Sequence, residues 1–305
     1  MRTTFFNIAS LGVLLAAFAV PATAATEWTF TCTTSCGSSS GSYGNTRTAT
    51  KDGVTVTASA YANTGNYGGS YNNLLQTAYL SWWNDGDGNT PPTGGLGVTN
   101  RDACTSSTTC GDYMEGSSPE HAMDNNQRWD AILFSFSDAI NLAQVGLSWY
   151  SNDADISVFA YQPGTVGGTA YGNPAAPNLA NGSTTYTGSS GLISKGWSLV
   201  GNYADLQTRT NYTANLNTNL VSSYWLVMAY NTAFGPGCND NSTSSGDGCT
   251  NGSTSHYDYM KLGLLGGTVP GGGGPSGGVP EPGTMLLLGA GLAGLVQARR
   301  RKAAG

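Results

Sequence analysis

The alternation of apolar and polar positions along the chain predicts short strands rather than long helices. Residues 54–60 alternate and are rich in strand-forming residues, which is typical of a half-buried strand. Residues 131–136 are apolar on both faces, and this pattern predicts a central strand. Residues 129–136, 145–150 and 156–161 lie close together and predict a meander. Further strands are predicted at residues 197–203, 224–230 and 257–265.

The composition supports an all-β fold. Only 10% of the residues are charged, and the chain holds 44 glycines. Gly, Ser, Thr, Asn and Tyr are abundant, whereas Glu and Lys, which favour long helices, are scarce. The sequence therefore predicts one antiparallel β-sandwich domain over residues 25–265, followed by a Gly/Pro-rich linker over residues 266–278.

The first 24 residues have the features of a secretory signal peptide. Arg2 precedes an apolar run at residues 5–20, and Ala22-Thr23-Ala24 supplies small residues for cleavage. We therefore expect a signal helix at residues 1–24 and export by the Sec machinery, with cleavage after Ala24.

The last 27 residues, 279–305, combine a Pro-rich motif, an apolar run and a basic end. Pro280, Glu281 and Pro282 precede the uncharged residues 283–298, and residues 299–302 are all basic. As a helix those 16 residues span roughly 24 Å, short of the roughly 30 Å hydrocarbon core. This predicts a short, marginal transmembrane helix whose basic end stays cytoplasmic.

This order of features resembles the PEP-CTERM sorting signal of Gram-negative bacteria. The resemblance implies processing by an exosortase near Pro280, Glu281 and Pro282, which are then recognised rather than catalytic residues. It also implies a transient membrane anchor, then a place at the cell surface or outside the cell. Such signals go with exopolysaccharide and biofilm.

The charge of the exported body differs from that of the whole chain. The chain carries −6, but residues 25–280 hold 7 basic and 17 acidic residues, a net charge of −10. An acidic body argues against nucleic acid as a partner. It is compatible with calcium or with neutral glycans.

Six cysteines in an exported chain predict disulfides. Their three close pairs favour local bridges, with zinc as the alternative. These pairs are Cys32–Cys36, Cys104–Cys110 and Cys238–Cys249.

Two acidic stretches are candidate ligand or cation sites. Asp153 and Asp155 share a face if a strand begins there, and could bind calcium or form a solvated start to the strand. Glu120, Asp124 and Asn125 precede the central strand and could form a cation or sugar site at the rim. Alternatively, Asp124 and Asn125 fix a turn while Glu120 pairs with an arginine.

Residues 95–161 resemble a family of exosortase-dependent surface proteins of unestablished function. Short motifs in the same order carry the likeness, among them residues 95–100, 118–125 and 130–136. The resemblance implies a jelly-roll, galactose-binding-like sandwich. It carries over no catalytic residue.

Catalysis is not expected. His121 and His256 are the only histidines, and neither lies in a nucleophile motif. The sequence thus predicts an exported, exosortase-processed surface or matrix protein associated with exopolysaccharide. The alternative is a carbohydrate-binding module, calcium-assisted, whose exposed Trp or Tyr rings stack on sugars; otherwise those rings pack between the sheets.

Overall fold

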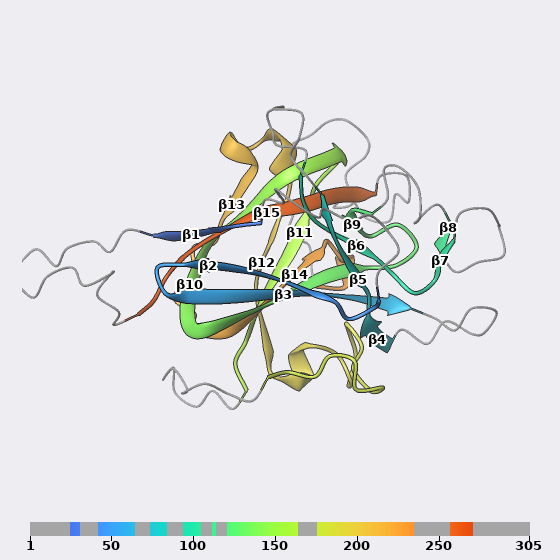
Figure 1. Cartoon of the computed structure of the whole chain (residues 1–305). Helices are drawn as coiled ribbons and strands as arrows, with labels where there is room; N and C mark the ends of the chain where they lie inside the picture. Colours follow the sequence, from blue (N-terminus) through green and yellow to red (C-terminus); the bar gives the residue numbers. More distant parts are fainter. Residues whose placement is uncertain are drawn as a thin grey trace, which may run out of the picture.

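The computed structural model describes residues 25–30, 42–64, 74–83, 94–104, 112–113, 121–163, 176–234 and 257–270. Within them, fifteen strands and four short 3-10 helices form the fold (Figure 1). The strands are β1 (Thr26–Thr29), β2 (Thr46–Lys51), β3 (Val54–Thr64), β4 (Leu74–Thr77), β5 (Tyr79–Trp83), β6 (Gly95–Thr99), β7 (Ala103–Cys104), β8 (Asp112–Tyr113), β9 (Met123–Asp124), β10 (Asp130–Asn152), β11 (Ile156–Tyr161), β12 (Trp197–Tyr203), β13 (Thr213–Asn215), β14 (Ser222–Ala229) and β15 (Asp258–Thr268). The helices are η1 (Ile193–Lys195), η2 (Leu206–Thr208), η3 (Thr210–Tyr212) and η4 (Thr232–Phe234).

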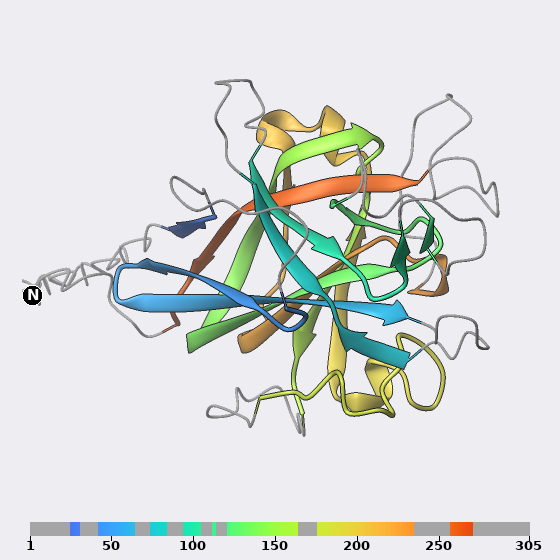
Figure 2. The ribbon, with the colours of Figure 1, turned by 45° about the vertical axis from the view of Figure 1, so that its right-hand side comes forward.

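Strand β10 organises the molecule because it takes part in two groups of strands. Its first half lies between β3 and β14, and its second half pairs with β15 and β13. All of these pairings are antiparallel, and they join thirteen strands into one sheet that contains both groups (Figure 1, Figure 2). Only β7 and β8, among the described strands, form a separate parallel pair.

The main core lies between the two groups of strands. In β3 the side chains alternate between buried and half-buried positions up to Tyr61, so that one face of the strand packs inward. Trp28 in β1 meets Phe136 in β10 edge-on, with ring centroids 5.0 Å apart. Contacts of this kind join the β1–β15 group to the first half of β10, as in the two layers of a sandwich.

A second core covers the opposite face of β10, β11 and β14. Leu133, Phe159 and Leu226 pack there against Tyr186 and Trp197. Residues 176–196, which contain little regular structure, therefore lie over an apolar sheet face. This explains why residues 131–136 are apolar on both sides.

The structure confirms the all-β antiparallel prediction and corrects its details. The predicted meander is wrong, because residues 130–136 and 145–150 belong to the single strand β10. The sandwich is built from one continuous sheet rather than two separate ones. Strand β15 ends at Thr268 and so extends into the stretch where the composition predicts a linker.

The two predicted terminal segments lie outside the described residues. The signal helix at residues 1–24 and the short transmembrane helix near the C-terminus therefore stay predictions. In the part of the chain that the structure describes, no helix has the length and apolar character needed to cross a membrane.

Candidate cation site

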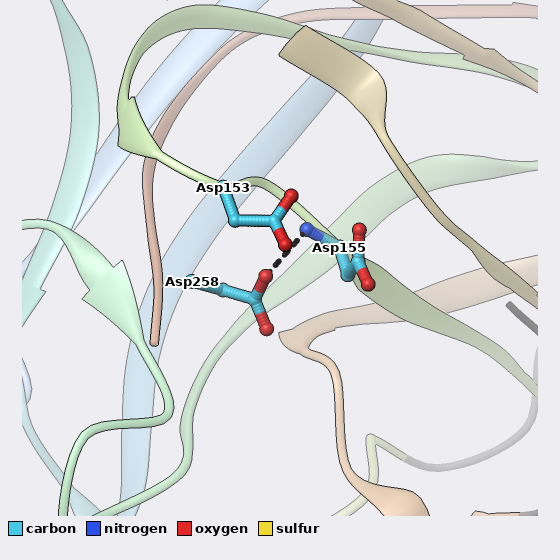
Figure 3. A group of neighbouring side chains, drawn as sticks. All are labelled: Asp153, Asp155 and Asp258. Carbon is cyan, nitrogen blue, oxygen red and sulfur yellow. Dashed lines mark hydrogen bonds between the residues drawn. The ribbon is translucent and has the colours of Figure 1, made fainter. Parts of the chain in front are cut away.

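Two aspartates that are close in the sequence and a third that is distant from them meet where three strands begin or end. Asp153 follows β10, Asp155 precedes β11, and Asp258 is the first residue of β15. Backbone bridging between Asp153 and Asp258 holds these segments together. One carboxylate oxygen from each residue lies within 4.8 Å of those of the other two (Figure 3).

The three carboxylates are removed from water. Asp155 and Asp258 are fully buried, and Asp153 is only 7% exposed. Neutral donors hold them: the backbone amide of Asp155 donates to Asp258 at 2.9 Å, and that of Asp205 donates to Asp155 at 2.7 Å. Asp153 accepts from its neighbour's amide, Ala154, at 2.8 Å.

Mutual repulsion acts on this cluster, which we call the acid trio. Burial raises the pKa of Asp258 well above its ordinary value, and the negative charges of Asp155 and Asp153 raise it further. Hydrogen bonds from the Asp155 amide and the Asn125 side chain offset only part of this shift. The trio would therefore gain from a bound cation or a proton.

Asn125, from the acidic stretch before the central strand, contacts the acid trio through Asp258. Its side-chain amide donates to the Asp258 carboxylate, and its side-chain oxygen accepts from the Asp258 backbone amide at 2.9 Å. It also donates to the backbone oxygen of Tyr230 at 3.1 Å. Asn125 thus fixes the position of Asp258 within the trio.

The geometry suits a hard cation. Calcium takes oxygen ligands at about 2.3–2.6 Å, so two ligand oxygens on one ion can lie up to about 5 Å apart. The 4.8 Å limit within the trio meets this condition. A carboxylate has about four lone-pair positions, so accepting one or two hydrogen bonds leaves room for a metal.

Of the predicted site residues, Asp153, Asp155 and Asn125 come together. Asp124 instead accepts a hydrogen bond from the backbone amide of Asn126 at 2.8 Å, as the turn interpretation predicts. Glu120 lies outside the described residues.

Five of the six cysteines, all except Cys104 in β7, also lie outside the described residues. The three disulfides therefore stay a prediction.

Sequence reasoning missed Asp258 and Gln207. The side-chain nitrogen of Gln207 in η2 donates to Asp153 at 2.8 Å. Its side-chain oxygen is buried and has no hydrogen-bond partner among the described residues. The only sequence feature that could have marked Asp258 as a site residue is its position at the start of a predicted strand. No sequence feature marks Gln207.

A second buried acidic group, which we call the arginine-paired group, lies near the start of β10. Asp102 forms an ion pair with Arg128 at 2.7 Å, and Asn100 donates to Asp112 at 2.6 Å. Asp130, the first residue of β10, is fully buried. Burial and the charge of Asp112 raise the pKa of Asp130 well above its ordinary value.

Comparison with known families identifies the C-terminal segment. Residues 278–302 match the PEP-CTERM protein-sorting motif, which contains Pro280, Glu281 and Pro282. This motif indicates exosortase-dependent sorting to the cell surface. No curated protein and no solved structure matches the chain. The likeness of residues 95–161 to exosortase-dependent surface proteins stays a prediction.

Proposed function

We propose that the chain is a surface or matrix protein that an exosortase processes and that works among extracellular polysaccharide. The sorting motif at residues 278–302 carries this proposal. A Sec signal peptide at residues 1–24 would start the same route. The net charge of −10 on residues 25–280 favours calcium or neutral glycans as partners over nucleic acid. The proposed role is binding or structural, without catalysis, on a jelly-roll-like, galactose-binding-like body.

Replacing Pro280, Glu281 and Pro282 with alanine tests the sorting step. We expect an uncleaved precursor that stays in the membrane fraction, measured by immunoblotting of membrane, surface and medium fractions. Pro275→Ala is the matched control, because it removes a proline just before the matched segment and should leave processing unchanged. Normal processing and release of the triple variant would contradict the proposal.

A second candidate function is calcium-assisted carbohydrate binding, and the acid trio favours it. Three buried carboxylates within 4.8 Å repel one another, and a divalent cation is the partner that offsets this repulsion most directly. The buried side-chain oxygen of Gln207 belongs to the amide that already contacts Asp153, so it is a candidate fourth ligand. The amide would need to turn over to present that oxygen to the ion.

Calcium titration of the exported protein tests this candidate. We expect calcium at about 100 times its dissociation constant to stabilise the fold by about 2.7 kcal/mol, which raises Tm by about 5–10 °C. Asp258→Asn should abolish most of this increase. Asp130→Asn is the matched control, since Asp130 is equally buried but outside the trio. If calcium raises Tm equally in wild type and Asp258→Asn, the ion does not bind at the trio.

A further inference from the structure

A hollow of about 580 Å³ opens beside the second half of β10. Strands β1, β10, β13 and β15 and helix η3 line it, and Tyr212 and Asn211 lie in its wall. Glu27 and Asn215, also in the lining, are exposed, so the hollow is open to solvent. Its volume falls within the range of about 300–1,000 Å³ that small-molecule sites occupy.

The lining combines an aromatic ring with planar polar groups. The Tyr212 ring is half-buried and leans on Tyr150, with centroids 5.6 Å apart and planes inclined by 37°. The Gln144 side chain donates to the Asn215 side chain at 3.1 Å, so two amides lie together in the lining. A sugar offers apolar C–H faces to such a ring and hydroxyls to such amides.

The backbone around Tyr212 adopts a conformation that side chains rarely accept. Asn211 and Tyr212 have φ angles of 56° and 51°, both in the left-handed region. Such conformations persist only where the surrounding structure imposes them, and they cluster at functional sites. The hydroxyl of Thr213 donates to the Asn211 backbone oxygen at 2.8 Å and helps to hold this turn.

The charge of the hollow selects the class of glycan. The described residues that line it include Glu27 but no lysine or arginine. With a body charge of −10, this disfavours acidic polysaccharides, which would be repelled. Neutral sugars bring no charge and need only the ring, the amides and the hydroxyls that the lining supplies.

We propose that this hollow binds a short segment of a neutral polysaccharide, with Tyr212 stacking on a sugar ring and Gln144 and Asn215 bonding its hydroxyls. The inference rests on the proposed role among extracellular polysaccharides, and it gives that role a site. The acid trio lies next to it along the chain, since Asp205 and Gln207, which contact the trio, stand shortly before η3.

Binding of the exported full chain to soluble polysaccharides tests the proposal. The probes are neutral glucans and galactans, with polygalacturonate as the acidic arm, measured by affinity electrophoresis and calorimetry. We expect binding to at least one neutral polymer. Tyr212→Ala and Asn215→Trp, which fills the hollow from an exposed position, should each weaken it by about tenfold or more. Tyr212→Phe, which keeps the ring, should stay close to wild type.

The matched control is Tyr43→Ala, because Tyr43 is an aromatic residue that is 45% exposed and outside the hollow. It should bind as wild type does. Melting temperatures identify any variant that fails to fold. If Tyr212→Ala does not fold, Asn215→Trp still tests the proposal. Absence of binding to every neutral polymer, binding to polygalacturonate alone, or unchanged affinity of Asn215→Trp would overturn the proposal.

The two proposals fail separately. If the hollow binds no glycan while the precursor is still processed through Pro280, Glu281 and Pro282, only the glycan site is overturned. If processing ignores those three residues while the hollow binds a neutral glycan, only the sorting role is overturned.

Discussion

The two buried acidic groups solve the same electrostatic problem in different ways. In the arginine-paired group, the guanidinium of Arg128 contacts Asp102. Burial and the charge of Asp112 raise the pKa of Asp130 in the same group. In the acid trio, Asp258 receives hydrogen bonds only from neutral groups, the Asn125 amide and a backbone amide, among its described partners. Because hydrogen bonds from neutral groups do not cancel charge, the trio is the better candidate for an external cation.

The largest loss of folding stability should come from removing the guanidinium of Arg128. Arg128→Met leaves Asp102, whose side chain is only 2% exposed, buried without its ion-pair partner. We expect the free energy of unfolding at pH 7 to fall by about 3–5 kcal/mol. Denaturation in urea measures this change, and Lys195→Met, at an exposed position, should change it by less than about 0.5 kcal/mol. A loss below about 1 kcal/mol for Arg128→Met would show that the pair does not compensate Asp102.

The second largest effect is the change of folding stability with pH that the acid trio causes. The pKa of Asp258 is raised in the folded state, so above the ordinary value of 3.8 the folded protein binds more protons than the unfolded one. Without calcium, stability should therefore fall as pH rises from about 4 towards the folded pKa. With calcium, which replaces the proton, stability at pH 7 should be about 2–3 kcal/mol higher than in a chelator.

Melting curves between pH 4 and pH 8, with calcium and with a chelator, measure this dependence. Asp130 contributes a slope of the same sign, because its pKa is also raised. Only the part due to the trio should respond to calcium. A calcium effect of equal size at pH 4 and pH 7 would contradict this, because protonation of the trio competes with the ion.

A smaller effect is expected from Asp130 itself. Asp130→Asn removes the repulsion from Asp112 and supplies an amide that can donate to that carboxylate. We expect the variant to be more stable by about 1 kcal/mol at pH 7 and equally stable near pH 4, where Asp130 is protonated. Asp138→Asn, at an exposed position of the same strand, should change nothing measurable. Destabilisation at pH 7 would mean that the charge of Asp130 is needed, as it would be for a second cation.

Local patterns predicted most strands but not the way in which they join. Strand β12 coincides with the prediction at residues 197–203, because its apolar and turn residues are local signals. The unity of β10 was missed because exposed Ser137 and Asp138 interrupt the apolar pattern, which is typical of a turn. The structure places an irregularity in the pairing there and continues the strand into the other group.

The candidate site shows the same limit. Asp153 and Asp155 were predictable because two acids beside a strand are visible in the sequence. Asp258 is more than a hundred residues away, and it reaches them only because β15 pairs with the end of β10. Gln207 depends on a 3-10 helix that no apolar period marks. Tertiary pairing, rather than residue type, completes the trio.

The smallest predicted effect tests whether the trio positions the wall of the hollow. Gln207 donates to Asp153, and the next helix after it carries Tyr212. Asp205, Asn211 and Tyr212 all have left-handed backbone angles, so this segment needs its anchors to keep its shape. We expect Gln207→Ala to lower the free energy of unfolding by about 1 kcal/mol, since the hydrogen bonds from its side chain to Asp153 at 2.8 Å and to Asp205 at 3.3 Å are lost.

The informative readout is glycan affinity, because a loosened anchor should weaken binding in the hollow by about threefold even where folding is intact. The matched control is Gln76→Ala in β4, which likewise shortens a glutamine and removes a side-chain hydrogen bond, from Thr64 at 2.6 Å. That variant should lose stability without losing glycan affinity. If both variants bind glycan equally well, the hollow and the trio are independent, and calcium would act on the stability of the fold alone.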